Sequence, residues 1–168
     1  MARTLIVDPS KCDGCRTCEA ACSTATLGWC SPNASRIKII QPQAAPFFYP
    51  LVCLQCEIPP CVSRCPTEAL EKDHRTGFVK LDQEKCPGCK ACIAACDIGA
   101  ISMVDGQLIK CDLCGGDPVC VKFCLTGALT YADPEEVAAY KRVAMAERAM
   151  ESLVAQNGGR SPAEGRDV

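Results

Sequence analysis

Short apolar segments separated by turn residues make up most of the chain. Between residues 5 and 109 these segments are rich in the aliphatic, β-branched and aromatic residues typical of strands. Two of them flank Asp105-Gly106, a strong signal for a two-residue hairpin turn. Prolines at 42, 46 and 50 keep two others short or at a sheet edge. We therefore predict strands over 5–7, 36–40, 47–52, 69–72, 78–81, 101–104 and 107–109.

From residue 133 onward the pattern changes to a helical period. Asp133 suits an N-cap and Pro134 suits the first helical position. One apolar stripe follows, formed by Ala139, Val143, Ala146, Met150 and Leu153. We predict a C-terminal helix over 133–157 and a disordered tail over 158–168. Such a helix is either a clasp for its own body or, as we favour, a docking arm for a partner subunit or another copy of the chain.

Seventeen cysteines stand out in a chain of 168 residues. Sixteen of them form four runs, and the spacing C-x2-C-x2-C-x3-C is unbroken in the first and third. The middle gap has four residues in the second run and five in the fourth. An aliphatic residue lies five positions after each fourth cysteine, so one supersecondary unit is repeated. We expect each unit to consist of a cluster loop, a helical turn after the third cysteine and a strand. The runs are Cys12, Cys15, Cys18 and Cys22; Cys53, Cys56, Cys61 and Cys65; Cys86, Cys89, Cys92 and Cys96; and Cys111, Cys114, Cys120 and Cys124.

Thiolates are soft ligands that suit iron–sulfur clusters, zinc or copper(I). Zinc sites usually pair two C-x2-C units or add histidine. Here three cysteines precede a fourth at a longer spacing, and the single histidine, His74, falls in an expected hairpin loop. In bacterial ferredoxins such a run gives three ligands to one [4Fe–4S] cube, and its fourth cysteine binds the other cube. We therefore predict four [4Fe–4S] clusters, with a zinc-stapled interaction module as the weaker alternative.

Composition narrows the functional classes. The N-terminus shows no secretory signal pattern, so grouped cysteines indicate metal binding in a reducing cytosol, and we expect a cytoplasmic protein. No apolar run reaches the roughly 18–20 residues of a transmembrane segment. A net charge of −2 argues against nucleic acid as a partner. The sequence carries no nucleotide, flavin or hydrolase motif, so we do not expect an enzyme.

Aromatic residues make up only 5% of the chain, so an apolar core alone would be thin. We expect the clusters to fill much of the interior and folding to depend on them.

The four runs resemble those of four-cluster ferredoxin-type subunits of multi-subunit oxidoreductases. This family includes electron-transfer subunits of the dimethyl sulfoxide reductase family and of formate- and carbon-monoxide-linked hydrogenase systems. The length and the C-terminal helix are also similar to the small iron–sulfur subunit of tungsten-dependent aldehyde oxidoreductases. The resemblance covers about residues 3–132. Among the fourth cysteines of the runs, only Cys65 is followed by proline, as in many ferredoxins, so we expect the turns after the other three fourth cysteines to differ.

The resemblance implies an α+β fold with two ferredoxin-like modules, each holding two [4Fe–4S] clusters, related by a pseudo-twofold repeat. Residues 1–132 would form this polyferredoxin domain. Runs 12–22 and 111–124 would make one module, and runs 53–65 and 86–96 the other. The family's crossed pairing gives four ligand sets: Cys12, Cys15, Cys18 and Cys124; Cys22, Cys111, Cys114 and Cys120; Cys53, Cys56, Cys61 and Cys96; and Cys65, Cys86, Cys89 and Cys92.

The function that the resemblance implies is electron transfer without catalysis. Single electrons would pass through the four clusters to or from a catalytic oxidoreductase subunit that carries molybdenum or tungsten, with an aldehyde oxidoreductase as one such enzyme. A flavin subunit and further copies of the chain are other partners that it allows. A freely diffusing polyferredoxin is the alternative.

A few residues stay outside these assignments. Cys30 is the odd cysteine, and we expect a small buried hydrophobic residue there. Lys85 and Lys110 directly precede cysteines of the runs, and Lys122 lies between Cys120 and Cys124. Each would raise a cluster potential, steer a partner or, as the simpler alternative, be an ordinary surface lysine.

Overall fold

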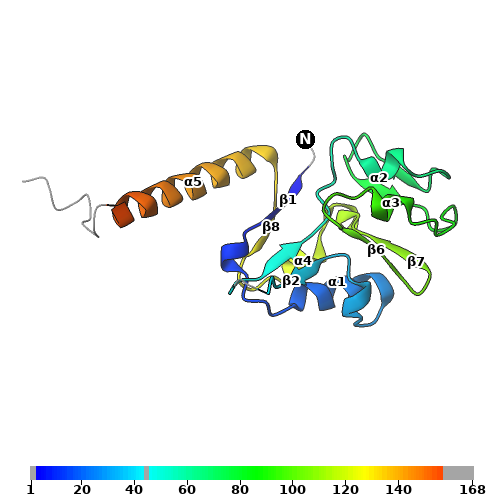
Figure 1. Ribbon diagram of the computed structural model, residues 1–168, viewed down its shortest axis with the longest axis horizontal. Helices are drawn as coiled ribbons and strands as arrows, with labels where there is room; N and C mark the ends of the chain where they lie inside the picture. The colour runs from blue at the N-terminus through cyan, green and yellow to red at the C-terminus, as the bar shows by residue number, and fades with distance from the viewer. Residues whose placement is uncertain (1–2, 44–45, 157–168) are drawn as a thin grey trace, which may run out of the picture. The chain divides into compact units, whose positions relative to one another are not determined.

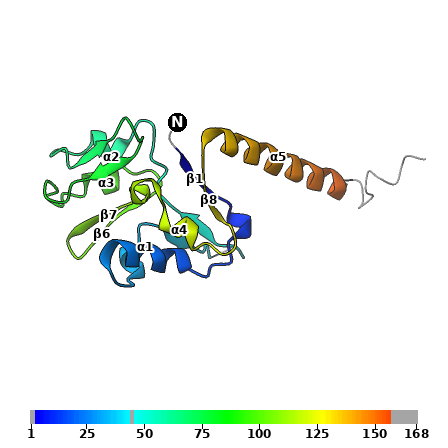
Figure 2. The same cartoon turned by 180° about the vertical axis from the view of Figure 1, so that it is seen from behind.

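The computed structural model describes residues 3–43 and 46–156, and these fall into two units. One unit is a body that ends at Ala132. The other begins at Asp133 and holds one long helix, α5 (Pro134–Gln156). Figure 1 shows the ribbon, and Figure 2 shows it from behind. The expected tail over 158–168 lies outside the described residues.

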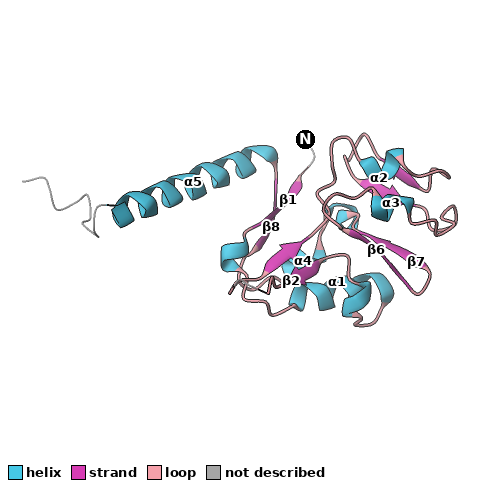
Figure 3. Ribbon diagram, viewed as in Figure 1, coloured by secondary structure: helices cyan, strands magenta, loops and turns pink. Residues whose placement is uncertain are grey.

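The strands of the body form two-stranded antiparallel sheets (Figure 3). The first and last strands pair with each other, with Thr4 opposite Ala132, so the two ends of the body meet. The other pairs are hairpins or near neighbours in the sequence. The sheets are β1 (Thr4–Val7) with β8 (Leu129–Ala132), β2 (Lys38–Ile40) with β3 (Tyr49–Leu51), β4 (Leu70–Lys72) with β5 (Val79–Leu81), and β6 (Ile101–Val104) with β7 (Gln107–Lys110).

Four helices of the body begin at the cysteine runs. They are α1 (Thr17–Leu27), α2 (Pro60–Ser63), α3 (Ala91–Ala94) and α4 (Val119–Lys122). Each starts one residue before the third cysteine of its run, so the expected helical turn after that cysteine is confirmed. Three-residue 3-10 turns cover Pro9–Lys11 and Pro32–Ala34, and a kinked one covers Leu113–Gly116.

The interior of the body holds two separate clusters of buried residues. The first combines cysteines of runs one and four with apolar side chains from β2, β8 and the segments beside them. The second combines cysteines of runs two and three with side chains from β4 to β7. Helix α1 contacts α4, and α2 contacts α3, and both views show these pairs side by side. The apolar members are Ile37, Ile39, Val52, Phe78, Leu113 and Leu129 in the first core, and Leu70, Val79, Ile101 and Leu108 in the second.

Helix α5 starts as the sequence predicts. The Asp133 side chain accepts hydrogen bonds from the backbone N–H groups of Glu135 and Glu136, at 3.0 Å each. In return the Glu136 carboxylate accepts from the backbone N–H of Asp133 at 2.9 Å, which completes a capping box. Large apolar side chains on this helix are exposed, among them Val143, Met150 and Leu153. No helix in the described part of the chain has the length and apolar character that a membrane crossing needs.

Helix α1 is longer than the single turn expected after Cys18, because its Ser- and Thr-rich second half stays helical. The hydroxyls of Ser23 and Thr26 each donate to the carbonyl four residues earlier, at 3.0 Å. This satisfies the polar groups inside the helix instead of leaving them to compete with it. The helix ends where Gly28 adopts the left-handed conformation, with φ of 85°.

Candidate metal-cluster sites

The loops between the first and second cysteines share one backbone feature. The residue just before the second cysteine is left-handed in all four runs: Gly14, Gln55, Gly88 and Leu113 have φ of 76°, 50°, 75° and 55°. Left-handed residues in a tight loop turn successive N–H groups toward a common anion. Glycine adopts this conformation without strain, and the sequence shows it in two of the four loops.

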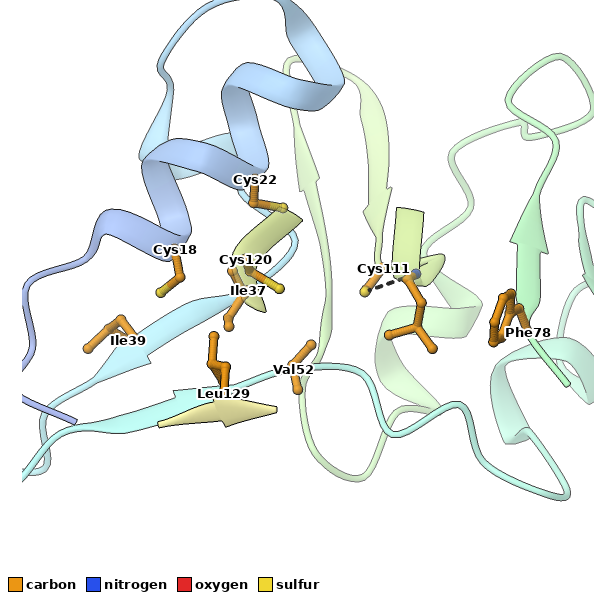
Figure 4. Close-up of a cluster of buried hydrophobic side chains, with 10 residues drawn as sticks. Cys18, Cys22, Ile37, Ile39, Val52, Phe78, Cys111, Cys120 and Leu129 are labelled. Atoms are coloured by element: carbon orange, nitrogen blue, oxygen red, sulfur yellow. Dashed lines mark hydrogen bonds between the residues drawn. The ribbon is translucent and has the colours of Figure 1, made fainter. Parts of the chain in front are cut away.

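Runs one and four come together in the first core. Cys18, Cys22, Cys111 and Cys120 are buried there, and Cys12 and Cys124 pack against them. Figure 4 shows Cys18 and Cys22 on α1 above Cys120 of α4. Burial raises the pKa of the Cys120 thiol, and the nearby Cys111, Cys22, Cys114 and Cys18 raise it further. The fourth cysteine of run one therefore lies among the cysteines of run four.

Runs two and three meet in the second core. Cys61 and Cys92 are buried, and Cys65, Cys86 and Cys96 pack against them. Burial raises the pKa of Cys61, with a smaller increase from Cys53 and Cys96 nearby. Cys53 also packs against the first core, so it lies where the two cores adjoin. The second cysteines of the first three runs, Cys15, Cys56 and Cys89, are exposed.

Several donors reach the cysteine sulfurs. The backbone N–H groups of Arg36, Ala100 and Leu113 donate to Sγ of Cys22, Cys96 and Cys111 at 3.4, 3.3 and 3.4 Å. The dashed line in Figure 4 marks the bond to Cys111. Such donors stabilise negative charge on sulfur and tune the potential of a cluster.

Threonines two residues after a fourth cysteine form a second set of sulfur contacts. Thr67 and Thr126 lie 3.8 and 3.7 Å from the sulfurs of Cys65 and Cys124. Slight burial would raise the pKa of Cys65, but backbone N–H groups of Leu70, Thr67 and Ala69 and the Thr67 hydroxyl outweigh it, so this pKa is lowered. These contacts favour the thiolate form of Cys65, which is the form that binds metals.

The buried thiols fit a positively charged metal group. Burial raises the pKa of both Cys18 and Cys111 to about 12, and it also raises those of Cys92 and Cys114. Iron binding must therefore release protons and supply positive charge to thiolates that the protein alone disfavours. Within the described ranges no His, Cys, Asp or Glu side chains gather closely enough to hold a single ion. That finding concerns single ions, since a cube separates its sulfur ligands more widely.

An ion pair ties the end of run one to run four. The guanidinium of Arg36 lies 2.7 Å from the Asp112 carboxylate, and the backbone N–H of the same residue donates to the Cys22 sulfur. Asp112 also accepts from the N–H of Cys114 at 3.0 Å. Partial burial acts to raise the pKa of Asp112, but the charge of Arg36 and these hydrogen bonds lower it overall.

A buried carboxylate lies beside Cys18, and sequence reasoning missed it. Glu19 is only 3% exposed, and its Oε1 accepts from the N–H of Ile39 at 2.7 Å. Its Oε2 is buried without a hydrogen bond and lies 3.6 Å from the Arg16 guanidinium. Because Glu19 is an ordinary helix former in sequence, only its place on the buried face of α1 shows that it ties α1 to β2.

The expectation for Cys30 is wrong, and one of the alternatives for Lys110 is excluded. Cys30 is exposed rather than buried, because it follows the end of α1 in a loop instead of lying in the core. Lys110 is 3% exposed, so it is not a surface lysine. Its counterparts are exposed and form ion pairs, Lys85 with Asp82 and Lys122 with Asp117.

Family comparisons agree with this geometry. Residues 44–134 match the model of the 4Fe-4S dicluster domain, and residues 5–27 match that of a 4Fe-4S binding domain. Between them the two matches include all four cysteine runs.

Similar proteins are iron–sulfur and electron-transport components. The polyferredoxin-like subunit of the aliphatic sulfonate oxidoreductase of Pyrococcus furiosus is 43% identical over 122 residues, which cover 71% of this chain and 70% of that subunit. The electron transport protein HydN of Escherichia coli is 36% identical, with 84% of this chain and 96% of HydN covered.

The beta subunit of the NADH-dependent phenylglyoxylate dehydrogenase of Aromatoleum evansii is 39% identical, covering 76% of this chain but only 30% of that larger subunit. The expected resemblance is confirmed: this chain belongs to the 4Fe-4S dicluster domain family of iron–sulfur electron-transfer proteins.

Proposed function

We propose that the body holds four [4Fe–4S] clusters in two ferredoxin-like modules related by a pseudo-twofold repeat. Runs 12–22 and 111–124 form one module, and runs 53–65 and 86–96 form the other. Two observations support this division: the separate cores that each combine two runs, and the contacts of α1 with α4 and of α2 with α3. The recurring left-handed residue before each second cysteine supports four loops of one kind.

The ligand sets that we propose are crossed between runs. Cys22 would join Cys111, Cys114 and Cys120, which is supported by its closeness to all three. Cys96 would join Cys53, Cys56 and Cys61, supported by its closeness to Cys61. By the same logic Cys124 would complete the set of Cys12, Cys15 and Cys18, and Cys65 that of Cys86, Cys89 and Cys92.

The chain is a non-catalytic electron-transfer component, and we propose that single electrons enter and leave through the exposed second cysteines. Bound [4Fe–4S] cubes supply one-electron chemistry. The protein's part is to hold the thiolates, to aim N–H donors at their sulfurs and to bury the third cysteine of each run. The observation that carries this function is the convergence of the four cysteine runs in two buried cores.

The partner that we propose is a catalytic oxidoreductase subunit with a molybdenum or tungsten cofactor, for which an aldehyde oxidoreductase is one candidate. Support comes from the P. furiosus and A. evansii relatives, which are named as subunits of oxidoreductases. A flavin subunit and further copies of this chain are additional candidates. Free thiols throughout the described body suit the reducing cytoplasm in which we place the protein.

A freely diffusing polyferredoxin is the second candidate, because HydN matches almost over its full length and is named only as an electron transport protein. Affinity purification of the tagged chain from its own host without oxygen separates the two. A stoichiometric oxidoreductase that reduces the chain's clusters when given its substrate supports the subunit. A monomer that exchanges electrons with several unrelated acceptors supports the mobile carrier.

A further inference from the structure

Lys110 is a buried cation where the two cores adjoin. It is the last residue of β7, and its side chain crosses from run four to β5. The ammonium Nζ donates to the carbonyl of Val79 at 2.9 Å and to that of Cys111 at 2.8 Å. Val79 belongs to the second core and Cys111 to the first.

Gln55 makes the same bridge without a charge. Its Nε2 donates to the Cys111 carbonyl at 2.8 Å, and its Oε1 accepts from the N–H of Val79 at 2.9 Å. The Cys111 carbonyl therefore accepts from both side chains. Gln55 and Lys110 therefore join the same two backbone segments, at Val79 and Cys111. Gln55 is the neutral bridge between the two cores, and Lys110 is the charged one.

The positive charge of Lys110 has no carboxylate partner among the described residues, since its hydrogen-bond acceptors are neutral carbonyls and none of the ion pairs there includes it. Burying a charge is costly unless an opposite charge compensates it. The candidates for that opposite charge are thiolates of the two cores that Lys110 bridges. Its Nζ donates to the carbonyl of Cys111 in the first core and to that of Val79, which packs in the second core with Cys61. These two cysteines belong to different cores and to different proposed ligand sets.

We propose that Lys110 is the internal counter-cation shared by the two clusters that Cys111 and Cys61 bind, and that it raises the reduction potential of both. This inference rests on the proposed function. It makes Lys110 a positioning residue that lies where the two modules adjoin. Each one-electron reduction adds negative charge to a cluster, and a fixed cation in a low-dielectric interior stabilises that charge strongly. The two clusters that Cys111 and Cys61 bind would therefore hold an electron more readily than the other two.

The test is an EPR-monitored redox titration of the holoprotein, purified without oxygen, for Lys110→Met and two matched variants. Gln55→Met removes the neutral bridge and leaves the charge in place. Lys85→Met removes a lysine that also directly precedes a cysteine of a run, but one that is 61% exposed and paired with Asp82.

In Lys110→Met the ratio of reduced to oxidised cluster at a fixed potential should fall about tenfold for two clusters, a shift of about −59 mV for a one-electron couple. The other two clusters should hardly move. This shift should persist in 1 M salt, because a buried charge is screened little. Lys85→Met should leave the potentials nearly unchanged, and Gln55→Met, which breaks the neutral bridge without removing a charge, should shift them clearly less than Lys110→Met does.

Unchanged potentials in Lys110→Met, or a shift equal to that of Gln55→Met, would overturn the inference. If Lys110→Met fails to hold clusters, Lys110→Arg should hold them because it keeps the charge, and failure of that variant too would make Lys110 a packing residue. Iron and sulfide analysis of the wild-type protein comes first. A wild type without clusters refutes the proposed function itself, whereas intact clusters with unmoved potentials refute only the role of Lys110.

Discussion

Single residues set the shape of the cluster loops. The two glycines that stand before second cysteines share one backbone conformation but have different neighbours. Gly14 and Gly88 have φ of 76° and 75°. A Cβ at Gly14 would lie 2.6 Å from the Phe48 ring, whereas one at Gly88 would lie 3.6 Å from the Met103 methyl, an ordinary contact. Both positions therefore require a left-handed backbone, and at Gly14 the Phe48 ring also leaves no space for a side chain.

We predict that Gly14→Ala destabilises the protein more than Gly88→Ala. Gly88→Ala should cost about 1–2 kcal/mol from left-handed strain alone. Gly14→Ala should cost clearly more, and Phe48→Leu in the same chain should restore part of the loss. The measurement is the guanidinium midpoint for loss of visible cluster absorption under anaerobic conditions. Equal losses for the two alanine variants would contradict the role of Phe48.

The ion pair between Arg36 and Asp112 should slow the release of iron. Arg36→Met should speed iron loss to a chelator about threefold at pH 7, because half-exposed pairs contribute up to about 1 kcal/mol. The pKa of Asp112 is lowered in the fold, so this contribution is present above the ordinary carboxyl value of 3.8 and disappears as the pH falls below it. Wild type and variant should converge in acid.

Lys80→Met is the control for the Arg36 variant, because it breaks an ion pair of the same 2.7 Å length with Asp73, away from the cysteine runs. An iron-release rate in Lys80→Met as fast as in Arg36→Met would show that any lost surface pair has this effect.

At the scale of elements, local signals were readable and distant pairings were not. The hairpin at Asp105-Gly106 and the helix from Pro134 to Gln156 follow from turn and capping residues, and both are confirmed. The pairing of β1 with β8 joins segments over 120 residues apart, which no local pattern reveals. The extension of α1 was missed because Ser and Thr favour turns unless their hydroxyls bond back to the helix, as they do here.

The candidate site shows the same division between composition and tertiary placement. The sixteen grouped cysteines could be predicted as cluster ligands because their spacing is typical of iron–sulfur binding. The place of Gln55 could not be predicted, since a loop Gln looks solvent-exposed in sequence, and for Lys110 the sequence left a cluster cation and an ordinary surface lysine as open alternatives. Their burial depends on β5 and run four lying next to each other, which only the fold provides.

Helix α5 makes its own prediction. Deleting residues 134–168 should leave the cluster content of the body unchanged and abolish assembly with the partner or with other copies, as measured by iron analysis and size-exclusion chromatography. On the apolar stripe, Val143→Ser with Met150→Ser should weaken assembly, and Met145→Ser, which is exposed but off the stripe, should not. A cluster-free, insoluble truncated chain would show instead that the helix clasps its own body.

At the scale of the whole molecule, the antiparallel pair of β1 and β8 holds run one beside run four, and the crossed ligand sets that we propose depend on this pairing. Cys124→Ser should therefore perturb the cluster held by Cys12, Cys15 and Cys18. Site-resolved EPR or Mössbauer spectra of the variant would detect the change. Cys30→Ser is the control, because Cys30 is exposed and outside the runs. A defect confined to the cluster of Cys111, Cys114 and Cys120 would refute the crossing.

We propose that this chain is a four-cluster electron-transfer subunit. Native mass spectrometry of the protein, purified without oxygen from its own host, weighs bound clusters and companion subunits together. We predict a mass with four [4Fe–4S] cubes on each chain and a larger oxidoreductase subunit bound to it. Zinc in place of iron, or fewer than four cubes on a freshly prepared chain, would contradict the claim, and four cubes on a lone monomer would refute the partner while leaving a mobile carrier.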